Sequence, residues 1–174
     1  MNLWHDIKPG TDEEINVIIE IPKGSQNKYE IDKETGLMAL DRANYSAAAY
    51  PCEYGFVPQT LWDDGDAVDV LLLASFPIPT GILVAARPVA LMEMIDTGEQ
   101  DNKIIAVPVN DKRWDNVHDI GDINPHTLQE LKHFFETYKT LKGKEVTVPG
   151  FKGVADAKAA FAKSVQLYKD KFPG

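Results

Sequence analysis

The first two-thirds of the chain consist of short apolar or alternating runs separated by turn residues. β-Branched residues dominate several of these runs, and Gly or Pro follows closely, a pattern that is typical of β-strands. The sequence predicts strands at residues 15–21, 28–31, 37–41, 68–73, 82–88, 89–95 and 104–109. Residues 32–36 are expected to form a hairpin turn between the second and third of them. Short strands joined by such turns predict a small barrel or sandwich.

In the last third of the chain, apolar residues recur at the period of an α-helix. Asn124 is a suitable N-cap for a helix that begins at Pro125, and Gly143 predicts its end. The expected apolar face of this helix comprises Leu128, Leu131, Phe135 and Tyr138. A second helix is predicted over residues 156–172, with an inward face of Ala157, Phe161, Val165 and Tyr168. We therefore expect residues 1–174 to form a single, mainly β domain with two C-terminal helices packed on it.

Composition and charge narrow the classes of function. Hydrophobic residues make up 44% of the chain and charged residues 26%, which is ordinary for a globular protein and too apolar for a disordered one. The longest apolar run has five residues, so we expect no membrane segment. Eighteen basic and 27 acidic side chains give a net charge of −9, which disfavours binding to nucleic acids or anionic membranes.

The cysteine content and the N-terminal sequence indicate the cellular compartment in which the protein is expected to act. Cys52 is the only cysteine, which excludes an internal disulfide and any site with several cysteine ligands. The N-terminal residues have neither the basic start nor the apolar core of a secretory signal. A reducing cytoplasm fits these features best.

The sequence lacks the motifs of several common enzyme classes. It contains no phosphate-binding G-x-x-x-x-G-K-[ST] loop, no G-x-G-x-x-G, no H-E-x-x-H and no G-x-S-x-G. An EF-hand beginning at Asp64 is excluded, because Asp69 stands where the turn glycine belongs and Ser75 where the bidentate Glu belongs.

The most informative segment is acidic and lies immediately before a predicted buried strand. Four of the seven residues from Asp63 to Asp69 are aspartates. Crowded carboxylates repel one another, so such a cluster is either solvated or neutralised by cations. Hard oxygen ligands of this kind suit Mg²⁺, which commonly bridges to substrate phosphates. On this segment alone, a polar turn without a ligand is an equally good interpretation.

Acidic residues with interspersed cations recur at other predicted strand ends. Residues 96–103 form a second acidic loop that ends in a lysine, and Glu20 ends an apolar strand. Lys28 and Glu30 share one face of the next strand, and Arg42 follows. In a barrel these groups would meet at one rim, where carboxylates can hold Mg²⁺ and cations and phenols can hold phosphate oxygens.

The segments that carry this pattern also match a known family in combination and order. They are residues 17–22 (VIIEIP), 28–32 (KYEID), 41–42 (DR), 50–58 (YPCEYGFVP), 64–70 (DGDAVDV) and 133–139 (HFFETYK). Along nearly its whole length the chain resembles the soluble family I inorganic pyrophosphatases of the short bacterial type. One position departs from the family pattern: Ala67 stands where the family usually has Pro, sometimes Glu. Because Pro would only stiffen the turn, we expect looser geometry there with the chemistry retained.

The resemblance implies a small closed OB-like β-barrel and Mg²⁺-dependent hydrolysis of pyrophosphate to two phosphates. The metal ligands that it implies are Asp64, Asp69, Asp96, Asp101, Glu20 and Glu30, with Asp69 shared between metals. The phosphate-binding groups that it implies are Lys28, Arg42, Tyr54, Lys103, Tyr138 and Lys139. Asp66 resembles the residue that takes a proton from the nucleophilic water. The resemblance also implies a homohexamer, and the outward position of His133 on its helix would fit a subunit contact.

Other interpretations remain open for single residues and for the whole chain. By periodicity alone Tyr138 is a core residue, and Lys139 could serve only as a cation near the helix C-terminus. Tyr50 lies near the matched positions without a clear role. The alternative enzyme is a Mg²⁺-dependent hydrolase of nucleotides or polyphosphate. The alternative that is not an enzyme is a non-catalytic, acidic Ca²⁺-binding module. This interpretation leaves the Lys, Arg and Tyr positions unexplained.

Overall fold

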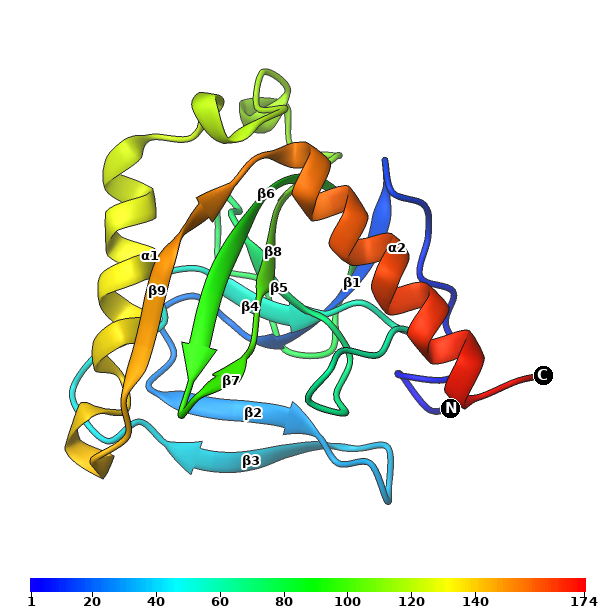
Figure 1. Cartoon of the computed structure of the whole chain (residues 1–174), viewed down its shortest axis with the longest axis horizontal. Helices are drawn as coiled ribbons and strands as arrows, with labels where there is room; N and C mark the ends of the chain where they lie inside the picture. Colours follow the sequence, from blue (N-terminus) through cyan, green and yellow to red (C-terminus); the bar gives the residue numbers. More distant parts are fainter.

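The computed structural model describes residues 1–174 and is built mainly from β-strands (Figure 1). The strands are β1 (Ile15–Ile21), β2 (Asn27–Ile31), β3 (Met38–Ala43), β4 (Glu53–Phe56), β5 (Asp69–Leu72), β6 (Leu83–Asp96), β7 (Glu99–Gln100), β8 (Lys103–Pro108) and β9 (Val146–Lys152). The α-helices are α1 (Pro125–Thr137) and α2 (Val154–Lys171), and three short 3₁₀ turns span Lys112–Trp114, Ile120–Asp122 and Thr140–Lys142.

Five strands close into a ring. Their order is β1-β4-β5-β8-β6, and β6 pairs again with β1 to complete it. All neighbours in the ring are antiparallel except β5 and β8, which run parallel. Closure leaves no free edge in the ring. The predicted fold class, a mainly β chain with a closed OB-like barrel and two C-terminal helices, is confirmed.

The long strand β6 joins the ring to the outer elements. Its first residues pair with β1, its middle with β8, and its last residues with β7 and β9. The prediction of two separate strands at residues 82–88 and 89–95 is wrong, because they form this one strand. The register with β8 shifts between Pro88 and Ala90, and at such a bulge a proline fits into a continuous strand.

Three strands were not predicted. β7 has only two residues, Glu99 and Gln100, in the segment expected to be an acidic loop. β4 is only four residues long, and it contains the polar Glu53 and the flexible Gly55. β9 contains Pro149 and Gly150, which together look like a turn in the sequence. Because β9 pairs only with β6, the missing N–H of Pro149 does not interrupt a second ladder.

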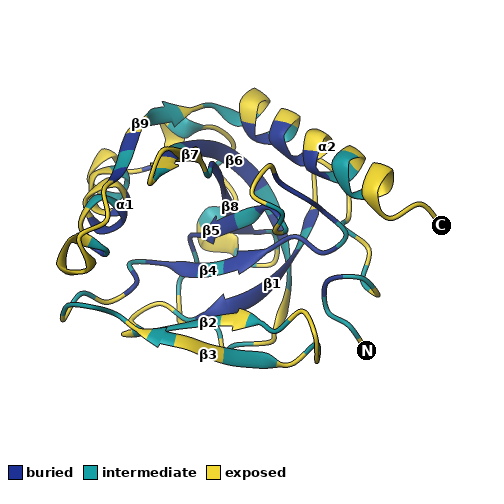
Figure 2. Ribbon diagram, turned by 60° about the horizontal axis from the view of Figure 1, so that its bottom comes forward, coloured by how far each residue is buried: buried dark blue, intermediate teal, exposed yellow.

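Both faces of β5 and β8 are covered, which explains their continuous apolar runs. On one face Val70 and Leu72 pack in a cluster with Phe161 of α2. On the other face Leu71 belongs to a cluster with Phe135 of α1. Figure 2 shows these central strands in the colour of buried residues, while the outer face of α2 is exposed. Each large side chain that is buried in this way contributes about 1.5–3 kcal/mol.

The helices begin near their predicted starts. The side chain of Asn124 accepts a hydrogen bond from the N–H of His126, as an N-cap does. The prediction that α1 continues to Gly143 is wrong, because the helix ends at Thr137 and Gly143 instead ends the following 3₁₀ turn at a φ of 78°. α2 begins two residues earlier than predicted, at Val154. Neither helix combines the length and apolar composition that crossing a membrane requires.

The expected inward faces are buried in part. On α1, Leu131, Phe135 and Tyr138 are buried, and Leu128 is half-buried. On α2 the buried residues are Ala157, Ala160, Phe161 and Ser164, whereas the predicted Val165 and Tyr168 are half-buried.

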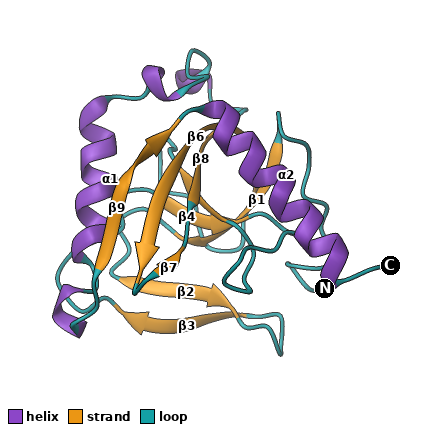
Figure 3. Ribbon diagram, in the orientation of Figure 1, coloured by secondary structure: helices purple, strands orange, loops and turns teal.

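Strands β2 and β3 form a separate hairpin that lies beside the ring, at the bottom of Figure 3. The space between this hairpin and the ring contains the predicted site residues.

We predict that Gly55→Ala destabilises the ring. A Cβ at residue 55 would lie 2.2 Å from the carbonyl oxygen of Ile18 on the neighbouring strand, and that backbone cannot move without disturbing the barrel. The free energy of unfolding should fall by about 1–3 kcal/mol, the usual cost of overpacking, when it is measured by urea denaturation. Gly121→Ala is the control, because a Cβ there meets no atom within 4 Å. Equal stability of the two variants would contradict this account of the β1–β4 packing.

Candidate active site

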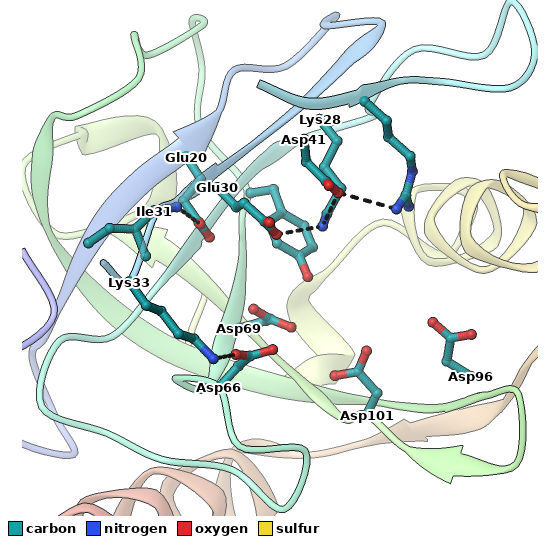
Figure 4. A network of polar contacts seen from close by, with 12 residues as sticks. Glu20, Lys28, Glu30, Ile31, Lys33, Asp41, Asp66, Asp69, Asp96 and Asp101 are labelled. Atoms are coloured by element: carbon teal, nitrogen blue, oxygen red, sulfur yellow. Dashed lines mark hydrogen bonds and ion pairs between the residues drawn. The ribbon is translucent and has the colours of Figure 1, made fainter. Parts of the chain in front are cut away.

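A cleft of about 650 Å³ lies between the β2–β3 hairpin and the ring. All but one of the predicted site residues line it: Glu20, Lys28, Glu30, Arg42, Tyr54, Asp64, Asp66, Asp69, Asp96, Asp101, Tyr138 and Lys139. Figure 4 shows carboxylates from the two sides pointing toward one another. The exception is Lys103, which is buried beneath the lining residues.

The lining of the cleft carries far more negative than positive charge. Its nine carboxylates belong to Glu20, Glu30, Asp32, Asp41, Asp64, Asp66, Asp69, Asp96 and Asp101. Its four cations are Lys28, Lys33, Arg42 and Lys139. Unless further cations neutralise the carboxylates, such a surface repels an anionic substrate.

Lys103 contacts three residues that form the floor of the cleft: Asp69, Asp101 and Tyr54. Its side chain is 1% exposed, and its Nζ donates hydrogen bonds to Asp69 at 2.8 Å, to Asp101 at 3.2 Å and to the Tyr54 hydroxyl at 2.9 Å. Residues 69 and 103 are direct partners in the parallel β5–β8 ladder, which places their side chains together. Burial favours a lower pKa for the Lys103 ammonium, but the charges of Asp101 and Asp69 outweigh it and raise the pKa above its ordinary value.

The aspartates of β5 and of the preceding loop differ in environment. Burial raises the pKa of Asp69 in spite of Lys103. Burial also raises the pKa of Asp64 to about 6, and the nearby charges of Asp101 and Asp69 add to this shift. Asp66 is exposed and forms an ion pair with Lys33, which reaches across from the end of the hairpin (Figure 4).

Glu20 connects the ring to the hairpin. It lies near the end of β1, and its Oε2 accepts a hydrogen bond of 3.2 Å from the N–H of Ile31 at the end of β2. Burial, followed by the charge of Asp69, raises the pKa of Glu20 to about 8. This carboxyl group is therefore protonated in much of the metal-free protein at neutral pH.

The hairpin presents two cations that are held by acids. Lys28 Nζ lies 2.9 Å from Glu30 and 2.8 Å from Asp41, and Arg42 lies 3.3 Å from Asp41. Lys28 and Arg42 are partners in the β2–β3 register, which explains their proximity. Asp41 and Lys33 were not among the predicted site residues. The matched DR segment at residues 41–42 was the available signal for Asp41, whereas Lys33 is brought to the cleft only by the tertiary fold.

The remaining wall comes from the ends of β6 and α1. Lys139 forms an ion pair with Asp96, and the side chain of Lys139 is 13% exposed. Tyr138, the C-cap that directly follows α1, packs on Phe134 with ring centroids 5.3 Å apart and also lines the cleft. Tyr138 is therefore both a core residue, as its periodicity predicts, and a residue of the cleft lining. Tyr50 is not part of the lining but packs edge-on behind Tyr54, at a centroid distance of 5.9 Å.

The donors in the cleft suit a hard divalent cation. They are carboxylate oxygens in excess over cations, with no cysteine or histidine among them. No three carboxylate, imidazole or thiol side chains in the chain already converge as a closed cage would require. Mg²⁺ retains several waters and is usually bound by one or two carboxylates plus substrate phosphates, so it does not need such a cage. The residues present therefore fit Mg²⁺.

Comparison with known proteins decides the family. The family model described as inorganic pyrophosphatase matches residues 17–169, nearly the whole chain and all of the predicted site residues. The chain belongs to the inorganic pyrophosphatase family. The inorganic pyrophosphatase of Haloferax volcanii is 46% identical, over 99% of each chain. A soluble inorganic pyrophosphatase of Zea mays is 48% identical over 95% of this chain and 78% of its own length.

A solved structure supports the same assignment. The inorganic pyrophosphatase of Thermus thermophilus superposes with a TM-score of 0.93 and 41% identity, over 97% of this chain and 99% of its own. The resemblance inferred from the sequence motifs is confirmed, and the protein is an inorganic pyrophosphatase that hydrolyses pyrophosphate. Family membership therefore rejects the non-catalytic Ca²⁺-binding module, and it favours pyrophosphate over nucleotides or polyphosphate as the substrate.

The raised pKa of Glu20 predicts how pH affects the metal-free protein. Its pKa is about 8 in the folded state and near 4.5 otherwise, so the folded state binds the extra proton between these values. The stability that Glu20 contributes is therefore complete below about pH 4.5 and is lost as the pH rises through about 8. Glu20→Gln, which keeps an acceptor for the Ile31 N–H, removes this loss.

In urea unfolding with excess chelator, Glu20→Gln should gain stability relative to the parent as the pH rises. The gain between about pH 5 and about pH 8 should be on the order of 2–4 kcal/mol, at roughly 1.4 kcal/mol per pKa unit. A difference between the two proteins that stays constant across this range would show that Glu20 titrates normally.

Proposed function

We propose that the cleft hydrolyses pyrophosphate with Mg²⁺ as the required cofactor and with the predicted site residues in their implied roles. One observation supports this most directly: twelve of the thirteen proposed residues, from distant parts of the sequence, line one cleft, and Lys103 binds three of them from beneath. Six of the nine acids lie on the ring side, and Lys28 and Arg42 lie opposite on the hairpin, beside Glu30 and Asp41.

The excess of carboxylates supports the cofactor. In this proposal the ligand residues are Asp64, Asp69, Asp96, Asp101, Glu20 and Glu30. When bound, Mg²⁺ neutralises these charges, lowers the pKa of a coordinated water and offsets the charge of the phosphates. Because burial raises the pKa of Asp64 and Asp69, a nearby cation would favour their ionised, ligating forms.

Asp66 is proposed as the general base that accepts a proton from the attacking water. It lies between Asp64 and Asp69 in the sequence and lines the same cleft. Its only ion-pair partner is Lys33, and its side chain is 57% exposed, so the carboxylate is accessible to water. The side chains of Asp69, Asp101 and Asp96 are only 18–19% exposed and are better suited to hold cations.

The cations and phenols are proposed to bind and orient the phosphates: Lys28, Arg42, Tyr54, Lys103, Tyr138 and Lys139. Arg42 and Lys28 present N–H donors where charge develops on phosphate oxygens, and such donors stabilise a phosphoryl transition state electrostatically. Lys103 acts from beneath, where it donates to the Tyr54 hydroxyl and fixes that group. The existing acid partners hold the cations in position before the substrate binds.

We also propose that residues 1–174 form one domain, that the protein assembles as a homohexamer and that it acts in the cytoplasm without nucleic-acid or membrane partners. The exposed position of His133 on α1 supports a subunit contact. The single buried thiol, Cys52, and the net charge of −9 support the compartment and the absence of polyanionic partners.

The cofactor proposal is tested by removing and replacing the metal. Chelation should abolish phosphate release from pyrophosphate, and excess Mg²⁺ should restore it. Ca²⁺ should restore it poorly, because its larger and looser coordination misplaces the reacting groups. The measurement is phosphate release with pyrophosphate and, separately, with ATP, which should stay uncleaved. Full activity in excess chelator would refute the proposal.

The role of Asp66 is tested by Asp66→Asn, which keeps the shape of the side chain and removes proton acceptance. We expect turnover to fall by about 10²–10⁴-fold, the usual contribution of a general base, while Mg²⁺ affinity changes little. The loss should shrink at alkaline pH, where hydroxide can attack directly. Asp12→Asn, at an exposed position outside the cleft, is the control for the loss of one charge. An unchanged rate and pH profile in Asp66→Asn would exclude Asp66 as the base.

A further inference from the structure

The loop that carries Asp64 and Asp66 is closed by the main chain of Trp62. We call residues 63–67 the aspartate loop. The N–H of Trp62 donates to the carbonyl of Asp66 at 2.7 Å, and the Trp62 carbonyl accepts from the N–H of Gly65 at 3.0 Å. Any shift of Trp62 is therefore transmitted through the backbone to the aspartate loop.

Helix α2 holds the start of this loop on the side away from the cleft. Lys163 Nζ lies 4.4 Å from the centroid of the Trp62 ring and donates to Asp63 Oδ2 at 2.9 Å. The carbonyl of Ser164 accepts a hydrogen bond of 2.9 Å from the N–H of Leu61. Two adjacent residues of α2 therefore contact the three residues that immediately precede Asp64.

The position of the Trp62 ring depends on packing and on Lys163. The ring is 5% exposed and belongs to the cluster that includes Ala157, Ala160 and Phe161 of α2. Its Nε1 is buried without a hydrogen-bond partner, so no directional bond fixes the ring in its plane. A cation over an indole face is attracted to the ring, and the ion pair with Asp63 holds that cation in place.

Lys163 cannot take part in the reaction directly. Neither Lys163 nor Trp62 lines the cleft, and Trp62 packs in the core cluster with residues of α2. The Lys163–Asp63 pair is nearly half exposed on each side, so it contributes little to global stability. Any effect on turnover would then arise from the placement of Asp64 and Asp66.

We propose that Lys163 is a positioning residue, which fixes Trp62 and Asp63 and thereby the aspartate loop for pyrophosphate hydrolysis. This inference rests on the proposed function, in which Asp66 is the general base and Asp64 a metal ligand. It assigns a role in the reaction to α2, an element that contributes no side chain to the cleft.

Lys163→Met tests the inference, because it keeps an unbranched side chain of similar length and removes the charge. At saturating Mg²⁺ and pyrophosphate we expect kcat to fall about 3- to 30-fold with KM nearly unchanged, since misplaced catalytic groups mainly affect the transition state. Lys163→Arg, which keeps a cation over the ring and toward Asp63, should restore most of kcat. Lys169→Met is the matched control on the same helix, at an exposed residue, and should behave as the parent.

Three results would overturn the inference. They are a parental kcat in Lys163→Met, an equal loss in Lys169→Met, and a failure of Lys163→Arg to recover. Thermal unfolding measured in parallel must show that Lys163→Met is folded at the assay temperature, because a loss that only follows unfolding would also overturn it. If Lys163→Met fails to fold, Asp63→Asn removes the ion pair alone and is judged by the same kcat criterion.

A double variant separates this inference from the proposed function. If Lys163 acts through the aspartate loop, adding Lys163→Met to Asp66→Asn should lower kcat by less than it does in the parent. Equal losses in both backgrounds would overturn the positioning role while leaving Asp66 as the base. If Asp66→Asn alone turned over at the parental rate, the proposed function would fail instead, whatever Lys163→Met does.

Discussion

The ion pairs of buried Lys103 with Asp69 and Asp101 are the interaction on which the rest of the site depends. The parallel β5–β8 register places residues 69 and 103 side by side, and the ring places Tyr54 of β4 within 2.9 Å of the same ammonium. Leaving either carboxylate buried without this partner would cost several kcal/mol. The barrel therefore determines the positions of Asp69, Lys103 and Tyr54 at the floor of the cleft. The loops add further carboxylates around these residues.

The second constraint is the imbalance of charge above that floor. Nine carboxylates face four cations in the lining, and this arrangement is stable only if the acids are protonated, solvated or neutralised. In the metal-free protein, the raised pKa values of Glu20, Asp64 and Asp69 favour the protonated, uncharged forms of these carboxyl groups. A bound divalent cation would neutralise these acids instead, and in the proposed function it also makes the cleft attractive to pyrophosphate. The same charge excess thus links the stability of the fold to the proposed requirement for Mg²⁺.

The sequence predicted much of this structure, and its errors have physical causes. The strand around residues 15–21 and the starts of both helices were predicted because periodicity and capping residues report on local structure. β9 was missed because Pro149 and Gly150 resemble a turn, and they are tolerated only because one neighbouring strand pairs there. Twelve of the thirteen predicted site residues line the cleft, because they were taken from motifs that match a family, and their individual roles stay predictions. Lys33 and Lys163 were not predicted, because contacts between distant segments bring them to the loop and no local pattern marks them.

The central claim is that bound divalent cations, and not the protein's own charges, make the cleft able to accept pyrophosphate. Calorimetric titration of pyrophosphate into the chelator-treated protein tests it most directly, with and without a divalent cation. To prevent turnover during the titration, Asp66→Asn is used with Ca²⁺ as well as with Mg²⁺. We expect no measurable binding without a divalent cation and clear binding with either ion. Equal affinity in the metal-free protein would contradict the account, because it would show that Lys28, Arg42 and Lys139 suffice to overcome the carboxylates.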